Sequence, residues 1–311
     1  MNLEPETRRG YYISAEMKKV WAVEMELLNK LLEVCKKHDL RIWAEGGTLL
    51  GAVREHGFIP WDDDIDMAMP REDFNRLREL ANDEFKTPYF FQCGYTDLFP
   101  SGMAKLRKDG TSAIEKENIF KNQHQGIFID IFPLDVIPDN KNEYFLFADY
   151  ASKLRIDLLL YCDHYFTLIN WDYNFQVIKT ILKTKYRGFS YYYKKYEDFV
   201  SQYMANDYSD VSLVVLGYHE QYIRNRKWYV NTSHTLFEDL NIPIPSGYHE
   251  VLMKQYGDYM IPKHEPAQHN GFEFLSAETS FEVILPILRK KYKKKRWENR
   301  KQHIIKFLKL K

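Results

Sequence analysis

The chain has 311 residues, 45% of them hydrophobic, and its 44 basic side chains balance its 44 acidic ones. This length can bury a sizeable core as one large domain or two small ones, and three scattered cysteines exclude a disulfide framework. No run of about 18 apolar residues predicts a transmembrane helix and no apolar segment predicts a secretion signal, so we expect a cytoplasmic protein.

The first predicted element is a long amphipathic helix that begins after Ser14 and ends near His38. Ser14 is of the residue type that caps helices. Apolar residues then recur at helical spacing, namely Val20, Val23, Leu27, Leu28, Leu31, Leu32 and Cys35. We interpret this helix as part of the scaffold.

Residues 45–70 carry the densest pattern of the chain, EGGTLLGAVREHGFIPWDDDIDMAMP. The apolar residues 42–44 predict a short strand that turns at Gly46 and Gly47 into a helix ending near Arg54. Glycines let the backbone approach a ligand closely. The N–H groups of a helix N-terminus favour phosphate, and Thr48 lies in the first turn of this predicted helix. An ordinary turn is the alternative interpretation.

A group of aspartates follows this predicted helix. On a strand, Asp62, Asp64 and Asp66 would share one face, and Asp63 the other. Carboxylates so arranged repel one another unless a cation lies among them, and this set suits Mg²⁺, with Mn²⁺ as a second choice. An acidic surface loop is the alternative, but the apolar residues that continue the strand after Asp66 favour a metal site.

The segment EGGTLLGAVREHGFIPWDDDID resembles the signature of the LicD family, whose members transfer phosphocholine or similar phospho-substituents to glycans. Fukutin and fukutin-related protein are more distantly similar through the same segment. The family belongs to the polymerase-β-type nucleotidyltransferases, marked by a Gly-Gly turn and a strand with Asp-x-Asp. The resemblance implies an α/β (α+β) fold, in which a nucleotidyltransferase-like mixed sheet is joined by a helical insertion and a C-terminal helical region.

Two cations are predicted on one face of a strand over residues 103–108. These side chains, Lys105 and Arg107, could neutralise a diphosphate, and the resemblance implies a basic strand at this place. Arg54, at the end of the signature helix, is a comparable candidate. The alternative for the strand is a half-exposed sheet face with solvated charges.

A second motif, GIFIDIFPLD, spans residues 126–135 and predicts a buried strand that one carboxylate, Asp130, interrupts. Burying an unpaired carboxylate costs several kcal/mol, so Asp130 needs a metal or an ion-pair partner. The resemblance implies that Asp130 is the third carboxylate beside Asp64 and Asp66. We expect Asp135 to cap a turn.

The whole sequence suggests four parts: a nucleotidyltransferase-like catalytic core over residues 1–140, a helical, aromatic-rich insertion over 141–208, the C-terminal part of the LicD-like domain over 209–288, and a basic amphipathic tail over 289–311. The tail holds twelve of the 44 Lys and Arg residues. Such a basic amphipathic helix is attracted to anionic lipid, so we expect peripheral contact with the inner face of the membrane. A solvated helix or a nucleic-acid patch is the alternative, although we expect no nucleic-acid partner.

The resemblance implies metal-dependent transfer of a phospho-substituent, phosphocholine from CDP-choline, to a hydroxyl of a surface glycan (lipopolysaccharide, teichoic acid or capsule), releasing CMP. The acceptor can be lipid-linked. We expect Asp64, Asp66 and Asp130 to be catalytic and to bind the metal with Asp62. The donor is expected to contact Gly46, Gly47, Thr48, Arg54, Lys105 and Arg107.

Two other functions stay open at this point. A nucleotidyltransferase could move NMP from an NTP to a small acceptor, and its pyrophosphate product would distinguish it. A non-catalytic glycan- or membrane-binding protein is the second alternative. The presence of all three aspartates and the Gly-Gly-Thr turn argues against it.

Overall fold

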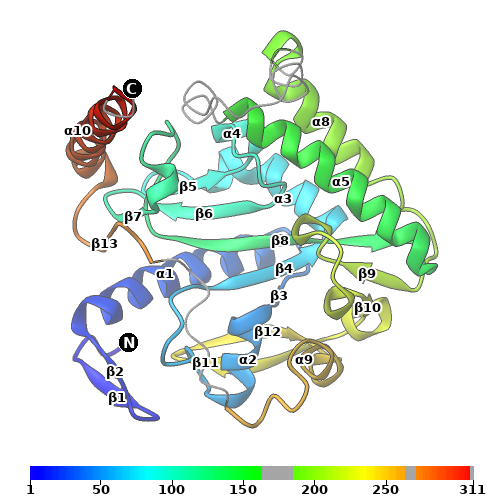
Figure 1. Cartoon of the computed structure of the whole chain (residues 1–311). Coiled ribbons are helices and arrows are strands. Elements are labelled where there is room, and N and C mark those ends of the chain that lie inside the picture. Colours follow the sequence, from blue (N-terminus) through cyan, green and yellow to red (C-terminus); the bar gives the residue numbers. More distant parts are fainter. Residues whose placement is uncertain (163–181, 183–184, 263–270, 309–311) are drawn as a thin grey trace.

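The computed structural model describes residues 1–162, 182, 185–262 and 271–308 of the chain, and the side chains of residues 295–308 are not considered (Figure 1). It begins with a hairpin of β1 (Glu6–Arg8) and β2 (Tyr11–Ile13), followed by α1 (Ala15–Lys37). The hydroxyl of Ser14 accepts a hydrogen bond from the Met17 amide, 3.1 Å away. This cap confirms the predicted start of the helix.

A mixed sheet forms the centre of the molecule. Its strands are β3 (Trp43–Ala44), β4 (Asp66–Pro70), β5 (Tyr89–Gln92), β6 (Ala104–Lys108), β8 (Phe128–Ile137), β9 (Asp210–Ser212) and β10 (Arg224–Asn225). Strand β8 is buried along its whole length and pairs in parallel with β4. Along its other edge it pairs antiparallel first with β6 and then with β9. The mixed sheet confirms the predicted fold class.

Helices cover both faces of this sheet (Figure 1). On one face α1 packs against β6 and β8, and on the other α3 (Arg71–Glu84) packs against β4, β5 and β8. Two further helices, α5 (Lys141–Cys162) and α8 (Phe189–Val200), pack on each other above α3 around a separate aromatic cluster. Part of the predicted insertion, residues 163–181 and 183–184, lies outside the described residues.

The strand β3 leads directly into α2 (Gly46–Arg54), as predicted from the sequence. Beside them lie the hairpin of β11 (Thr232–Phe237) and β12 (Leu240–Pro245), and then α9 (Tyr248–Tyr256). Segments far apart in the chain thus surround the Gly-Gly turn. The remaining helices and strands are α4 (Gly94–Asp97), β7 (Ser112–Ile114), β13 (Phe274–Ser276) and α10 (Phe281–Leu308).

Two predictions from the sequence were wrong. The residues from Asp62 to Ile65 form a loop, and the strand begins only at Asp66. Asp135 does not cap a turn: it is fully buried in β8, where Arg71 donates to both of its carboxylate oxygens at 2.6 and 3.0 Å. The charge of Asp135 is therefore satisfied inside the core by an ion pair that links β8 to α3.

The basic tail forms the last part of α10, and its contact with a membrane stays a prediction. None of the described helices is both long and apolar enough to span a bilayer. The predicted boundaries at residues 140, 208 and 288 also stay predictions. His264 and His269, whose spacing in the sequence is a weak signal for a metal site, lie outside the described residues.

Candidate active site

The Gly-Gly turn places backbone directly against carboxylates. Gly46 has a φ of +53°, in the left-handed region, and a Cβ there would lie 3.2 Å from Asp66 Oδ2. A Cβ on Gly47 would lie only 2.4 Å from Asp62 Oδ2. Position 46 therefore needs glycine for its backbone conformation, and a side chain at position 47 would displace the Asp62 carboxylate.

The same turn is bonded to the start of β4. The Asp66 amide donates to the hydroxyl of Thr48 at 2.8 Å, and the Glu45 amide donates to the carbonyl oxygen of Asp66 at 3.0 Å. The Thr48 side chain is buried and does not line the cavity described below. In this structure Thr48 therefore positions Asp66, and its predicted contact with phosphate stays a prediction.

A cavity of about 410 Å³ opens beside the turn. Its acidic lining consists of Asp62, Asp64 and Asp66 from the signature segment, with Glu45 and Asp258. Arg54 is the one cationic side chain among its described lining residues. The polar part of the wall also includes Trp61, Tyr222, Tyr256 and Tyr259, and two glutamines, Gln221 and Gln255. A space with this excess of carboxylates attracts cations.

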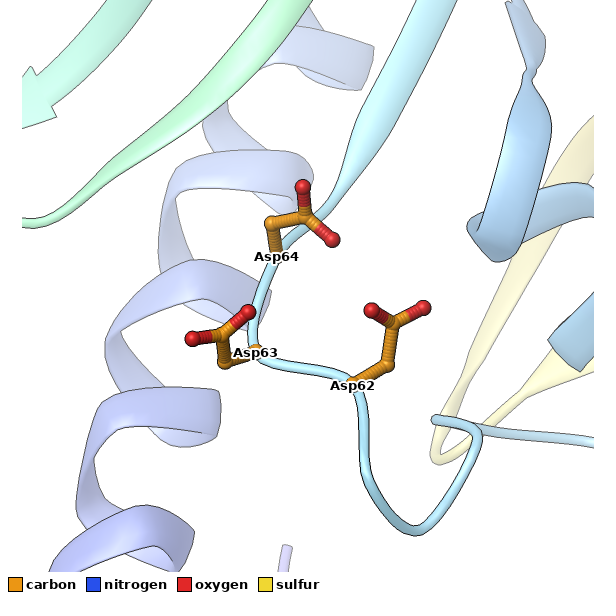
Figure 2. Close-up of side chains that lie close together, drawn as sticks. All are labelled: Asp62, Asp63 and Asp64. Atoms are coloured by element: carbon orange, nitrogen blue, oxygen red, sulfur yellow. The ribbon is translucent and has the colours of Figure 1, made fainter. Parts of the chain in front are cut away.

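The acidic loop brings three carboxylates together (Figure 2). Asp62, Asp63 and Asp64 each offer an oxygen within 4.8 Å of the others. Figure 2 shows Asp63 on the side of the loop that faces α1. Asp62 and Asp64 line the cavity instead. The loop is fixed to α1 by the indole N–H of Trp21, which donates to the Asp62 carbonyl oxygen at 3.2 Å.

Strand pairing sets Asp66 beside the third predicted carboxylate. Asp66 on β4 and Asp130 on β8 are direct partners in the parallel register. Burial raises the pKa of Asp66 well above its usual range, and the neighbouring charges of Asp64 and Asp130 raise it further. A carboxylate in these surroundings is stabilised in its charged form only by a nearby cation.

Lys105 supplies one such cation from β6. Its Nζ lies 2.7 Å from Asp130 Oδ1 and 3.4 Å from the centre of the Phe128 ring, and both ends of the ion pair are nearly buried. The predicted ion-pair alternative for Asp130 is thus present. Burial lowers the pKa of Lys105, although Asp130 opposes this shift.

Arg107 lies on the same face of β6, as predicted, but its hydrogen bonds are made within the protein. It donates to the Gln92 side chain and to the Gly126 carbonyl oxygen, both at 2.6 Å. Neither Lys105 nor Arg107 is among the described residues that line the cavity. Arg54 does line it, and also donates to the Tyr259 carbonyl oxygen at 2.9 Å.

The sequence analysis missed a buried ion pair behind the turn. Arg224 donates to both carboxylate oxygens of Glu45 at 2.5 Å, and also to the Tyr229 hydroxyl at 2.8 Å. Glu45 directly precedes Gly46, so this pair holds the backbone at the rim of the cavity. The partners are 179 residues apart, and no local pattern in the sequence relates them.

The residues present fit a hard divalent cation. Carboxylate oxygens of Asp62, Asp64 and Asp66 line one space, and the two glycines let the carboxylates of Asp66 and Asp62 lie against the turn. Mg²⁺ and Mn²⁺ prefer such carboxylate oxygens together with phosphate oxygens of a substrate. Within the described part of the chain, the acidic loop is also where three potential ligands lie closest together.

Comparison with known proteins finds relatives through the segment that contains the Gly-Gly turn and the acidic loop. Residues 39–156 match the family described as LicD/FKTN/FKRP, nucleotidyltransferase domain. The chain is 29% identical over 248 residues to the lipopolysaccharide cholinephosphotransferase LicD of Haemophilus influenzae, covering 78% of this chain and 90% of that protein. It is 37% identical over 59 residues to the human ribitol 5-phosphate transferase FKRP, which is 19% of this chain and 12% of FKRP. The chain therefore contains a LicD-type domain over residues 39–156, and its similarity to LicD indicates a phosphotransferase of the LicD type.

Proposed function

We propose that this protein transfers phosphocholine from CDP-choline to a hydroxyl of a cell-surface glycan and releases CMP, in a reaction that depends on Mg²⁺. The observation that carries this proposal is the convergence of Asp62, Asp64 and Asp66 on one cavity beside the Gly-Gly turn. The similarity to a lipopolysaccharide cholinephosphotransferase supports the choice of reaction and makes lipopolysaccharide the first acceptor to test.

The transfer is a substitution at phosphorus. The acceptor oxygen bonds to the phosphorus that carries choline, and the bond from that phosphorus to the oxygen bridging to CMP breaks. The hydroxyl proton passes to a carboxylate of the cavity, and the electron pair of the broken bond leaves with CMP. A bound Mg²⁺ would neutralise charge on the diphosphate.

The protein's own residues bind and orient the donor in this scheme. Gly46 and Gly47 begin α2, whose free N–H groups favour the diphosphate, and the carboxylates of Asp66 and Asp62 lie against the same turn. Arg54 faces the same cavity as a cation for the donor. Asp64 and Asp66 would provide carboxylates that hold the metal, together with Asp130, the strand partner of Asp66.

The wall of the cavity supports choline as the substituent on the donor. Trp61, Tyr222 and Tyr256 line the same space as the aspartates. Aromatic rings and carboxylates both attract a quaternary ammonium group, whereas ribitol and glycerol carry no such charge. We therefore propose that these rings contribute to the selection of CDP-choline.

Product analysis tests the proposed reaction. The enzyme is incubated with Mg²⁺, choline-labelled CDP-choline and lipopolysaccharide, and the products are separated. We expect label on the lipopolysaccharide and an equal amount of free CMP. Pyrophosphate released from an NTP, with the nucleotide left on the acceptor, would instead support the nucleotidyltransferase alternative. Failure of the full chain to bind CDP-linked donors or nucleotides in the presence of Mg²⁺ would favour a non-catalytic role.

A further inference from the structure

Tyr256 is the last residue of α9, and its hydroxyl lies beside the Gly-Gly turn. The helix α9 packs against α2 (Figure 1), and Tyr256 is among the residues that line the cavity. A Cβ on Gly46 would lie 4.0 Å from the Tyr256 hydroxyl oxygen and 3.2 Å from Asp66 Oδ2. The hydroxyl and this carboxylate therefore approach the N-terminus of α2 from the same side of the turn.

A chain of hydrogen bonds fixes this hydroxyl. Arg224, whose guanidinium holds Glu45, also donates to the Gln255 side-chain oxygen at 2.8 Å. Because that oxygen accepts from Arg224, the NH₂ group at the other corner of the amide faces Tyr256, and it donates to the hydroxyl oxygen at 3.1 Å. The position of the hydroxyl is thus set by the same buried arginine that holds the turn.

The Tyr256 hydroxyl still has its own proton to donate. A phenol carries one donor, and here its oxygen already accepts from Gln255. Within the described part of the chain, no group accepts a hydrogen bond from this proton. Burial raises the pKa of Tyr256, and the charges of Glu45 and Asp66 raise it further, so the proton is retained at neutral pH. A hydrogen-bond donor without a protein acceptor therefore lies beside the turn.

We propose that this hydroxyl donates to a phosphate oxygen of the CDP-linked donor and so helps to hold the diphosphate at the N-terminus of α2. Phosphate oxygens are strong acceptors, and a helix N-terminus favours them. The carboxylates beside the turn repel phosphate unless a cation lies between them, whereas a neutral hydroxyl can contact it directly. The inference deepens the proposed function and rests on it, because it assigns Tyr256 to the diphosphate that every CDP-linked donor shares.

Tyr256→Phe tests the inference, because it removes the hydroxyl and keeps the ring. Binding of CDP-choline and of CDP to the full chain is measured by calorimetry in the presence of Mg²⁺. We expect the affinity for each ligand to fall by roughly 10–100-fold, as for the loss of a hydrogen bond to a charged group. The two losses should be similar, because both ligands carry the diphosphate and only one carries choline.

Two controls separate a contact with the diphosphate from a structural role. Tyr248→Phe removes a hydroxyl from a half-buried tyrosine of the same helix that is not among the described residues lining the cavity. This variant should bind both ligands like the unmodified chain. Binding of Mn²⁺ without nucleotide, measured by electron paramagnetic resonance, reports on the carboxylates. Tyr256→Phe should leave the Mn²⁺ affinity unchanged, because the proposed contact is with phosphate.

Each other outcome has a distinct meaning. Unchanged affinity of Tyr256→Phe for both ligands would overturn the inference and leave the proposed function intact. A loss confined to CDP-choline would also overturn it, because the hydroxyl would then serve choline. Weaker Mn²⁺ binding by Tyr256→Phe would mean that Tyr256 acts through the carboxylates and would contradict the inference. Failure of the unmodified chain to bind CDP-choline with Mg²⁺ would instead contradict the proposed function itself.

Discussion

Asp66 and Asp130 are direct partners in the parallel pairing of β4 with β8. The Asp130 amide donates to the Ile65 carbonyl oxygen at 2.8 Å, which fixes the two strands at the point where the acidic loop enters the sheet. The two carboxylates thus come from residues 64 positions apart in the sequence. Backbone pairing between the two strands fixes their relative position, which therefore does not depend on flexible side chains alone.

The first prediction concerns the close approach of Gly47 to Asp62. In Gly47→Ala the new Cβ would meet Asp62 Oδ2 at 2.4 Å, so the carboxylate must move. Because the atom met is the free end of a half-buried side chain, we expect a loss of stability of about 1 kcal/mol or less, and a loss of transferase activity because Asp62 is displaced from the cavity. Denaturant unfolding and a transfer assay measure the two effects.

A double-mutant cycle supplies the control for this prediction. Asp62→Ala removes the group that the new methyl would strike. The stability cost of Gly47→Ala should therefore be much smaller in the Asp62→Ala background than in the unmodified chain. Equal costs in both backgrounds would show that the clash is not the cause.

The second prediction concerns the buried pair of Arg224 and Glu45. Arg224→Met leaves the Glu45 carboxylate buried without its cation, and breaking such a pair costs about 3–5 kcal/mol. Adding Glu45→Gln should restore much of the lost stability. Lys153→Met is the control, because its pair with Asp149 is exposed and should contribute less than about 1 kcal/mol. Chemical denaturation compares the variants, and a small loss in Arg224→Met would contradict the assignment.

The third prediction concerns the pH dependence of stability at His124. Its Nδ1 accepts a hydrogen bond from the Gly126 amide at 3.2 Å, and its Nε2 lies 3.0 Å from Asp109 Oδ1, so the neutral ring with a proton on Nε2 satisfies both contacts. Burial lowers the pKa of His124 to about 4. The pKa of His124 is lower in the folded chain than in the unfolded chain. The neutral ring therefore stabilises the fold fully above about pH 6.5, and this stabilisation is lost as the pH falls toward 4.

His124→Gln tests this dependence. The free energy of unfolding of the unmodified chain, relative to that of the variant, should fall by roughly 2–3 kcal/mol between pH 7 and pH 4. The reason is that only the unmodified chain buries a ring that titrates in this range. Thermal or urea unfolding across this pH range measures the difference. A difference that stays constant with pH would rule out the lowered pKa.

The fourth prediction concerns the aromatic wall. Trp61→Leu should raise the KM for CDP-choline by roughly tenfold and leave the KM for CDP-glycerol nearly unchanged. The reason is that only the quaternary ammonium group of choline is attracted to the face of the indole ring. Tyr12→Leu, at an exposed residue of the N-terminal hairpin, is the control and should change neither value. Equal increases for both donors would mean that Trp61 supports the cavity without selecting choline.

Local patterns predicted much of the scaffold. Ser14 and the apolar spacing after it gave the bounds of α1 almost to the residue, and the glycines at 46 and 47 marked the turn into α2. These features depend on neighbouring residues. The strand predicted through Asp62 and Asp64 failed because alternation alone does not show where a loop ends and pairing with β8 begins.

The missed contacts are those that only the tertiary fold creates. Arg224 reaches Glu45 across 179 residues, and Asp135 meets Arg71 only because α3 packs on β8. Glu24, which is buried in α1, left a signal that could have been used: it shares the core-facing side of the helix with the buried residues Trp21 and Leu28. A charged residue on the apolar face of a predicted helix is a reason to search for its partner.

The most direct test of the proposed function is the release of CMP from CDP-choline in the presence of lipopolysaccharide, compared between the unmodified chain and Asp66→Asn, with Mg²⁺ and with EDTA. We expect Mg²⁺-dependent release that falls by roughly 10²–10³-fold or more in Asp66→Asn, while its melting temperature is maintained. Near-normal release by Asp66→Asn, or release that EDTA does not reduce, would contradict the proposed function.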